Sequence, residues 1–295
     1  MSASTPRVTI GMPVYNGERF LAEALDSILT QTFDDFRLVV SDNGSTDGTV
    51  AILEEYAARD PRIIVLRGDQ NRGASWNYER TFDDCESPYF KWAAADDLLA
   101  PTYLERLVEA LDEAPKASLA YPRTKLIDEE GNVLREIDDN LAAKPGAPPH
   151  VRLRHAILNV SYGNPAFALN RTDAVRRTRL VQTFPWADYI LLAELALAGD
   201  FCSVPEPLFL RRVHEGMSMR ASKSNLTSWF DPHRPAVKNP ALNLLPQYFA
   251  AVNQVGLRGR ERLLAYVTIL PAWAMRFVGF RSRLRRVAEE LRRRR

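Results

Sequence analysis

The chain has 295 residues, of which 46% are hydrophobic and 26% are charged, values typical of a soluble globular protein with a sizeable core. Its two cysteines form no CxxC pair, which argues against a disulfide framework or a cysteine-based zinc site and favours a reducing compartment. The net charge of +2 is uneven, because residues 258–295 hold twelve Arg and three Glu, which is +9 and leaves about −7 for the rest.

Strands alternate with helices over the first part of the chain. We expect strands at residues 7–12, 36–41, 62–66 and 89–93, and helices at 18–31, 50–58, 73–82 and 101–111. Pro13 is expected to end the first strand. This alternation predicts parallel βαβ units in a doubly wound α/β sheet. No GxGxxG follows the first strand and no GxxxxGK[ST] occurs, so dinucleotide and P-loop sites lose their main support.

Polar segments follow three of these strands, at residues 13–16, 42–49 and 96–97. The carboxyl ends of parallel strands meet at one edge of a sheet, where ligands bind, so we expect the three segments to line one crevice. Asp96 and Asp97 repel each other unless a cation offsets them, and Mg²⁺ or Mn²⁺ prefers such oxygen ligands. The alternative is that Asp96 caps the next helix and Asp97 is solvated in its first turn.

The second half of the sequence predicts further strands at 117–124 and 166–170, a hairpin near 128–132, helices at 152–158 and 186–198, and an extended segment at 201–213. Residues 144–149 form a loop that could move over a substrate crevice or be an inert surface loop. The first seven residues lack a charged segment followed by an apolar one, so we expect no signal peptide and a cytoplasmic protein.

Four motifs together resemble family 2 glycosyltransferases with the GT-A fold. Residues 8–17 and 41–49 resemble the family's opening, and Asp96–Asp97 resembles its DxD-type metal site. Residues 186–189 resemble its catalytic Asp segment, and residues 211–218 its late Arg-x-x-His stretch. The likeness covers residues 7–218, but Ala94 stands where the family often has a further Asp.

The resemblance implies a GT-A fold, in which helices flank a Rossmann-like mixed α/β sheet. A catalytic domain at 1–218 would comprise a nucleotide-binding half at about 1–115 and an acceptor-binding half at about 116–218. Residues 219–295 would form a basic, helical C-terminal extension. The expected chemistry is inverting transfer from a nucleotide-diphosphate sugar with Mn²⁺ or Mg²⁺ as cofactor.

The resemblance also suggests residues for the nucleotide. Tyr15 would stack on the base, with Pro13 and Asn16 beside it, although Tyr15 could simply pack at a strand end. Asp42 would accept the N3–H of uracil or thymine, or else form an Asx turn before the next helix. Arg72 would reach the diphosphate, or be an ordinary exposed loop residue.

Three residues are expected at the metal. Asp97 would be the principal ligand, Asp96 would contact the ribose or a metal-bound water, and His214 would complete the shell or be structural.

Asp188 is the candidate general base, because inverting transfer needs a carboxylate opposite the leaving group and near the acceptor hydroxyl. Its rival role is a helix-start Asp stabilised by the helix dipole. The family's usual Glu-Asp is replaced by Ala187-Asp188. Glu194 is the alternative base.

The C-terminal sequence is apolar at 263–280, with Pro271 and Arg276, and basic and amphipathic at 281–295. This pattern favours an interfacial anchor on anionic lipid as much as a helical appendage packed on the catalytic domain. The Arg run lacks any nucleic-acid-binding module, so we expect no nucleic-acid partner.

The expected activity is transfer from a UDP-sugar, or a dTDP-sugar, to a hydroxyl of a polysaccharide or lipid-linked glycan, on the inner face of the cell membrane. Three alternatives stay open: a catalytically silent nucleotide-sugar or glycan-binding relative, a sugar-phosphate nucleotidyltransferase, and a membrane adaptor that acts through its tail alone.

Overall fold

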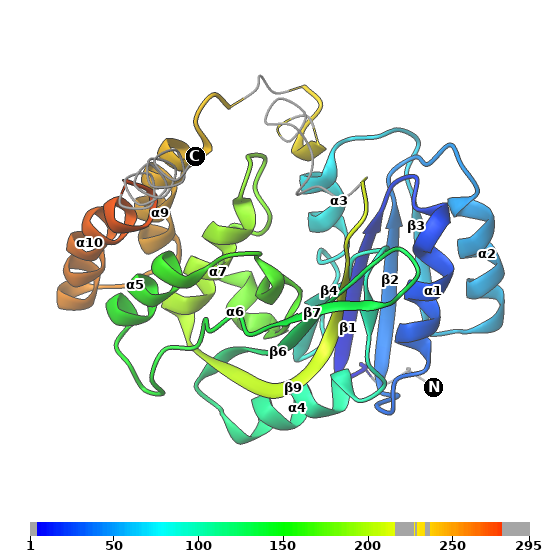
Figure 1. The fold of residues 1–295 in the computed structure, drawn as a ribbon, viewed down its shortest axis with the longest axis horizontal. Helices are drawn as coiled ribbons and strands as arrows, with labels where there is room; N and C mark the ends of the chain where they lie inside the picture. Colours follow the sequence, from blue (N-terminus) through cyan, green and yellow to red (C-terminus); the bar gives the residue numbers. More distant parts are fainter. Residues whose placement is uncertain (1–4, 216–226, 228, 234–236, 279–295) are drawn as a thin grey trace, which may run out of the picture.

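The computed structural model describes residues 5–215, 227, 229–233 and 237–278. The described residues form one mixed sheet in the order β3-β2-β1-β4-β8-β6-β9-β5, with β7 paired to β6 (Figure 1). Its strands are β1 (Val8–Val14), β2 (Phe36–Asp42), β3 (Ile63–Arg67), β4 (Tyr89–Trp92), β5 (Leu98–Leu99), β6 (Ala117–Ile127), β7 (Val133–Ile137), β8 (Leu169–Arg171) and β9 (Asp200–Arg212).

The sheet combines a parallel and a mixed part. Strands β3, β2, β1 and β4 are parallel neighbours. Strand β8 runs antiparallel to both β4 and β6, and the long β9 is parallel to β6 and antiparallel to β5. The mixed α/β sheet flanked by helices that we expected is therefore confirmed. The carboxyl ends of β1, β2 and β4 lie at the same edge, which places their polar segments together.

Helices cover the sheet and form a separate group at its β6–β9 end (Figure 1). They are α1 (Glu18–Leu29), α2 (Thr49–Arg59), α3 (Ala74–Arg80), α4 (Tyr103–Glu113), α5 (Pro149–Asn159), the 3₁₀ turn η1 (Asn164–Phe167), α6 (Thr172–Arg176), α7 (Ala187–Ala198), α9 (Pro240–Gln254), α10 (Gly259–Trp273) and the π turn η3 (Ala274–Val278).

The core of the parallel part follows from residue periodicity. Alternate β1 residues Val8, Ile10 and Met12 are fully buried. They share a cluster with Leu21 and Leu25 of α1, which lie on one face of the helix at i and i+4. Burying a large aliphatic side chain stabilises the fold by about 1.5–3 kcal/mol, so this strand–helix pair anchors the parallel part of the sheet.

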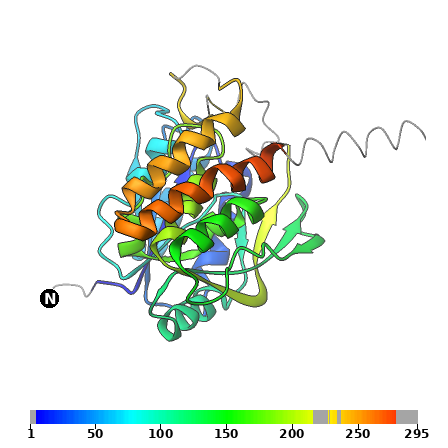
Figure 2. The same cartoon turned by 90° about the vertical axis from the view of Figure 1, so that its left-hand side faces the viewer.

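The expected C-terminal helices are present and share a core with α5 and α7. Leu153 of α5, Ile190 of α7, Leu244 of α9 and Ile269 of α10 are buried in one cluster. Asn239 caps α9 by accepting the N–H of Leu242 at 3.2 Å. Figure 2 shows α9, α10 and α5 side by side on this end of the molecule.

Two local expectations are wrong. Pro13 does not end β1, because its register partner is Ser41 of β2 and the pairing of β1 with β4 stops earlier, at Gly11. The N–H that proline lacks is therefore not needed by β4. The alternative role of Asp96 as a helix cap, with Asp97 in the first turn, is wrong as well, because β5 follows the pair and α4 begins only at Tyr103.

Candidate active site

A cleft of about 540 Å³ lies over the carboxyl ends of β1 and β4. It is lined by Pro13, Val14, Tyr15, Asn16, Gly17, Arg19, Phe20, Asn43, Asn71, Ala74, Asn77, Tyr78, Ala94, Ala95, Asp96, Asp97, Phe167, Arg211, Arg212, His214 and Trp229. All three polar segments thus reach it, although the second does so through Asn43.

The β1 end of the cleft is held by hydrogen bonds to the loop after β2. Asn16 has a positive φ of 50°, and its side-chain oxygen accepts the N–H of Thr46 at 2.8 Å. The N–H of Asn16 donates to the hydroxyl of Ser45 at 2.9 Å. These bonds leave the ring of Tyr15 44% exposed at the cleft, which suits a stacking surface.

Asp42 lies below the cleft rather than in its lining. Its carboxylate is 1% exposed and accepts the N–H groups of Gly44 and Ser45 at 3.2 Å, which is the turn geometry of the alternative role. The next residue, Asn43, lines the cleft and accepts the N–H of Arg72 at 3.0 Å. A base contact by the Asp42 carboxylate would require this turn to open.

Arg72 also lies outside the lining residues of the cleft. It pairs with Asp69 at 3.0 Å, and its guanidinium lies 5.0 Å from the ring centre of Trp76. Its exposed position is that of an ordinary loop arginine, and a diphosphate contact would require the side chain to swing from Asp69.

Asp96 and His214 are in contact beyond the end of β4, and Asp97 is the next residue along the chain. His214 Nε2 lies 2.8 Å from Asp96 Oδ2, and its ring packs on Phe20. Asp97 is 8% exposed, and its Oδ1 accepts the backbone N–H of Arg212 at 2.9 Å. Burial, together with the charge of Asp96, raises the pKa of Asp97 to about 7. A cation would relieve this repulsion.

The side chains of Asp96, Asp97 and His214 have the chemistry of ligands for a hard divalent ion, since they offer two adjacent carboxylates and one imidazole. However, the described residues contain no group of three or more His, Cys, Asp or Glu side chains already arranged around one point. Mg²⁺-type ions are commonly held by one or two carboxylates plus substrate phosphates. The residues therefore fit an ion whose shell is completed by a diphosphate.

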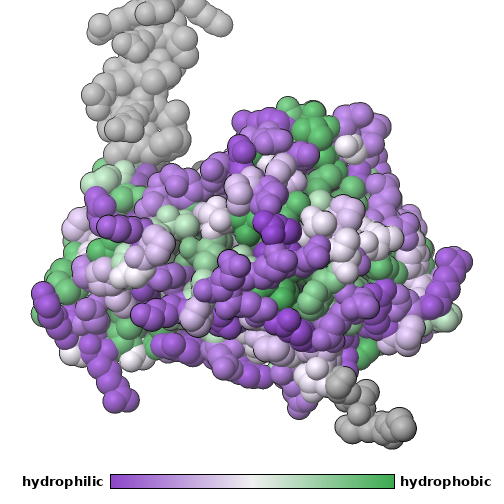
Figure 3. Space-filling view, turned by 90° about the horizontal axis from the view of Figure 1, so that it is seen from below, coloured by the Kyte–Doolittle hydropathy of each residue, from purple (hydrophilic) through white to green (hydrophobic). Residues whose placement is uncertain are grey.

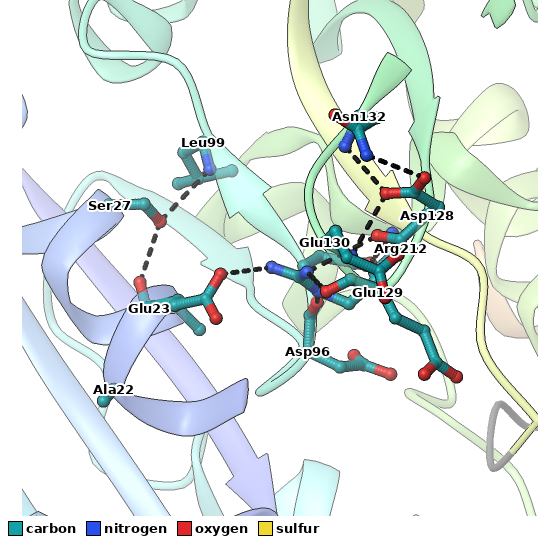
Figure 4. Close-up of polar contacts among 12 residues, drawn as sticks. Ala22, Glu23, Ser27, Asp96, Leu99, Asp128, Glu129, Glu130, Asn132 and Arg212 are labelled. Carbon is teal, nitrogen blue, oxygen red and sulfur yellow. Dashed lines mark hydrogen bonds and ion pairs between the residues drawn. The ribbon is translucent and has the colours of Figure 1, made fainter. Parts of the chain in front are cut away.

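Arg212 fastens the Asp pair to its surroundings (Figure 4). Its side chain is completely buried and donates to the backbone oxygen of Asp96 at 3.1 Å and to that of Glu129 at 2.6 Å. It also pairs with Glu23 of α1 at 2.7 Å. One guanidinium thus joins α1, the turn after β4 and the turn between β6 and β7.

Asp188 is in the first turn of α7, beside the cleft. Its Oδ2 packs against Gly163 so closely that a Cβ added to this glycine would lie only 2.0 Å from it. Burial raises the pKa of Asp188 to about 6, and the positive charge of Arg211 lowers it against that effect. A carboxylate with a pKa near neutrality is suited to general-base chemistry. Asp188 does not line the cleft itself, but Tyr78 and Arg211, on which its charge acts, do.

Arg211 is positioned by a buried polar network. It donates to the side-chain oxygen of Asn164 at 2.6 Å and to the backbone oxygen of Tyr162 at 2.7 Å. Asn164 in turn donates to Asp139. The positive charge of Arg211 lowers the pKa values of both Asp97 and Asp188. The guanidinium therefore acts on the candidate metal ligand and on the candidate base together.

Glu194 is not an alternative base. It is fully buried, and its carboxylate accepts the backbone N–H of Arg179 at 2.8 Å and the Nε–H of the same residue at 2.6 Å. Both oxygens are occupied in a structural ion pair.

The family model for glycosyl transferase family 2 matches residues 9–178, which is more than half of the chain. The chain belongs to glycosyl transferase family 2.

Curated relatives match over part of their length. A chondroitin synthase of Escherichia coli is 30% identical over 129 residues, 44% of this chain and 19% of that protein. An uncharacterized glycosyltransferase of Methanocaldococcus jannaschii is 31% identical over 133 residues, 44% of this chain and 46% of that protein. The matched segments therefore span less than half of either relative.

Solved structures share the fold over nearly all of the chain. TarS 1–349 of S. aureus, in complex with UDP-GlcNAc, has a TM-score of 0.64 at 15% identity, covering 92% of this chain and 73% of that one. The mannosyltransferase PcManGT of Pyrobaculum calidifontis, in complex with GDP-Man and Mn²⁺, has a TM-score of 0.55 at 16% identity, covering 95% and 76%. These likenesses confirm the expected GT-A fold.

Three residues of this family 2 member were missed by sequence reasoning. Tyr78 of α3 lines the cleft, where the charges of Asp96, Asp97 and Asp188 raise its pKa further above a value already raised by burial. Trp229 also lines the cleft, 40% exposed, with its ring 6.5 Å from that of Tyr78. Nothing in the sequence indicates that either residue lies at the cleft, because Tyr78 is one position of a helix and Trp229 is far along the chain from the polar segments.

Lys91 is the third missed residue. It is fully buried on β4, where its ammonium donates to the backbone oxygen of Trp92 at 2.8 Å. Burial lowers its pKa to about 7. The apolar residues on either side of Lys91 predict a buried strand, and they do not indicate that a lysine side chain is buried with them.

Within the described residues, no helix is long and apolar enough to cross a membrane. The basic segment at 281–295 lies outside the described residues, so the predicted tail anchor cannot be followed there.

Proposed function

We propose that this protein is a metal-dependent, inverting glycosyltransferase that moves a sugar from a UDP-sugar to a hydroxyl acceptor. The observation that carries the proposal is the position of Arg211, whose charge acts on both Asp97 and Asp188. One positive charge thus acts both on a proposed metal-site carboxylate that lines the cleft and on a candidate base, outside the lining, whose pKa is raised. Membership of glycosyl transferase family 2 supports this chemistry.

We assign the donor to the β1 side of the cleft. Tyr15 presents its exposed ring to the base, with Pro13 and Asn16 forming the wall around it. The Asp42 turn and its neighbour Asn43 are proposed to set the edge of the base pocket. UDP and dTDP share the edge that such groups read, so dTDP-sugars stay in the donor class. TarS, which shares the fold, is bound to UDP-GlcNAc in its solved structure.

The proposed cofactor is Mn²⁺ or Mg²⁺, held by Asp97 with Asp96 and His214. The ion supplies Lewis-acid stabilisation of the negative charge that develops on the leaving diphosphate. PcManGT, which shares the fold, was solved with Mn²⁺ and GDP-Man.

We assign Asp188 to the acceptor. As a general base it would accept the proton of the attacking hydroxyl while the sugar–phosphate bond breaks on the opposite face. Trp229 and Tyr78 would frame the acceptor sugar above the metal site. We propose that residues 1–115 hold the donor and residues 116–218 most of the acceptor, with Tyr78 and Trp229 completing the acceptor side from outside the second range. The proposed acceptor is a polysaccharide or lipid-linked glycan at the inner face of the cell membrane.

Calorimetry with UDP, dTDP, GDP and CDP, with and without Mn²⁺, tests the donor assignment. We expect UDP or dTDP to bind more tightly than GDP or CDP, and the affinity to fall at least about tenfold without Mn²⁺. In the Asp97→Asn variant the Mn²⁺ effect should disappear. Equal affinity for all four nucleotides would contradict the donor assignment.

A second assay separates transfer from the alternatives. UDP release from a UDP-sugar, measured with and without a glycan acceptor, should be stimulated by the acceptor. Pyrophosphate release from a nucleoside triphosphate and a sugar phosphate would instead identify a nucleotidyltransferase. Donor binding with no turnover across an acceptor panel would identify a silent relative.

A further inference from the structure

We propose that the outward face of α10 and η3 docks on the surface of an anionic lipid bilayer. We call this surface the outer face and define it by five side chains: Leu263, Val267, Leu270, Met275 and Val278. The inference rests on the membrane location proposed above and assigns the contact to a helix within the described structure, not to the arginine-rich tail alone.

The outer face is apolar and exposed. Its five side chains are between 55% and 62% exposed. Leu263, Val267 and Leu270 follow at i, i+4 and i+7, which puts them in one row along the helix. Figure 2 shows α10 running along the outside of the helical group, between α9 and α5.

The opposite side of α10 is already used. Ala265, Ile269 and Trp273 are buried in the cluster shared with α5, α7 and α9. Arg276, which would interrupt an apolar surface, donates to the backbone oxygens of Leu158 and Val160. The helix is therefore apolar on its packed side and on its solvent side. A helix in water normally has a polar solvent side, so the outer face is suited to a partner.

The arginine residues around α10 indicate that the partner of the outer face is negatively charged. Arg258, Arg260 and Arg262 are exposed at the start of α10. Immediately beyond η3 the sequence of residues 281–295 adds eight Arg and two Glu. Positive charge thus lies at the start of the apolar row and dominates the sequence that follows it, which matches an anionic headgroup layer and opposes the approach of a second copy of the same face.

The geometry fits a helix that lies in the bilayer interface. Because α10 packs on α5 and α9 along one side, only its outer face can enter the lipid. Figure 3 shows a largely hydrophilic face of the molecule, with hydrophobic groups lying between the hydrophilic ones.

The test is flotation of the full chain with vesicles of equimolar phosphatidylglycerol and phosphatidylcholine, without donor or acceptor. We expect wild-type protein to float with these vesicles and not with pure phosphatidylcholine. The Leu263→Ser/Val267→Ser/Leu270→Ser variant should lose at least about tenfold in bound fraction. Raised salt should weaken wild-type binding.

The matched control is Val133→Ser/Leu134→Ser on β7, where both side chains are 55% exposed. This variant should float like wild type. Thermal unfolding and UDP calorimetry of both variants check that the fold and the donor site are intact. Because vesicle binding is measured apart from donor binding, failure of the docking proposal and failure of the proposed function give different results.

Three outcomes would overturn the proposal. Wild-type protein could fail to bind the anionic vesicles, or the triple variant could bind them as well as wild type. Light scattering could show a lipid-free dimer that the triple variant splits, which would make the outer face a contact between copies. Hydrogen exchange at 263–270 could rise when residues 279–295 are deleted, which would mean that the chain's own tail covers the face.

Discussion

Gly163 is in direct contact with Asp188: a Cβ added to Gly163 would lie 2.0 Å from Asp188 Oδ2 and 3.2 Å from its Cγ. Gly163 has a φ of +69°, a conformation that favours glycine. The hydroxyl of Tyr189, next to Asp188, donates to the backbone oxygen of Ser161 at 2.5 Å. The loop before η1 therefore sets the position of the proposed base.

We predict that Gly163→Ala lowers kcat by about a hundredfold, because the new methyl group displaces the Asp188 carboxylate. The backbone strain of an L-residue at positive φ should also destabilise the protein by about 1–2 kcal/mol. Gly146→Ala is the control, since Gly146 has a φ of +73° but no atom within 4 Å of its added Cβ. It should lose stability in urea unfolding and keep its activity. If both variants lose activity equally, strain and not displacement is responsible.

Asp188→Asn should lower the transfer rate by about 10²–10⁴-fold while UDP still binds with wild-type affinity. The amide keeps the shape but cannot accept a proton. Burial raises the pKa of Asp188 from 3.8 to about 6, so the cost of ionising it in the folded protein grows as the pH rises through this interval and is fully present above it. The Asn variant should therefore be at least as stable as wild type at pH 8. A matching loss of UDP affinity would remove Asp188 from the role of base.

At saturating donor and Mn²⁺, which would keep Asp97 ionised, the pH profile of kcat should fall as the pH drops through about 6, because the base must be deprotonated and the pKa of Asp188 is raised to that value. Arg211 lowers this pKa, so Arg211→Gln should move the acid limb to higher pH. Arg211→Lys retains the charge and should leave the limb near its wild-type position. If the acid limb of the pH profile is unchanged in Arg211→Gln, the limb belongs to a group other than Asp188.

Arg212→Met should reduce the free energy of unfolding by about 2 kcal/mol or more, measured in urea. The substitution leaves the backbone oxygens of Asp96 and Glu129 without their buried donor. Arg106→Met is the comparison, since Arg106 pairs with Glu206 at the exposed surface and its loss should leave the midpoint unchanged. Equal effects of the two substitutions would show that Arg212 does not fasten these turns.

Much of the fold could be predicted because its parallel part is built from local patterns. Each early strand is a short apolar run that ends in polar residues, and each following helix has one apolar face. Parallel strands end at the same edge, so the meeting of Asn16 with Asp96 and Asp97 followed from chain order alone. Pro13 was misjudged because its effect depends on which neighbouring strand needs its N–H.

The site was less predictable where two similar polar residues lie near each other in the sequence and either could serve the site. Asp42 and Asn43 are adjacent and both polar, but strand alternation and the turn direct Asn43 to the cleft and Asp42 to backbone N–H groups. Glu194 and Asp188 are both acidic residues of α7. Only the contact with Arg179 shows that the Glu194 carboxylate is engaged in a buried ion pair and is therefore not the base.

The sequence by itself determined the family, the sheet edge that carries the cleft and the adjacent acidic pair, because these depend on residue order and short-range periodicity. The tertiary structure decided which side chains meet across long separations: Arg211 beside Asp97 and Asp188, Trp229 beside Tyr78, and Gly163 against the base. Such pairs form when β9 and the loop before η1 pack against the parallel strands. Their contacts depend on how whole elements stack, which no local pattern of residues encodes.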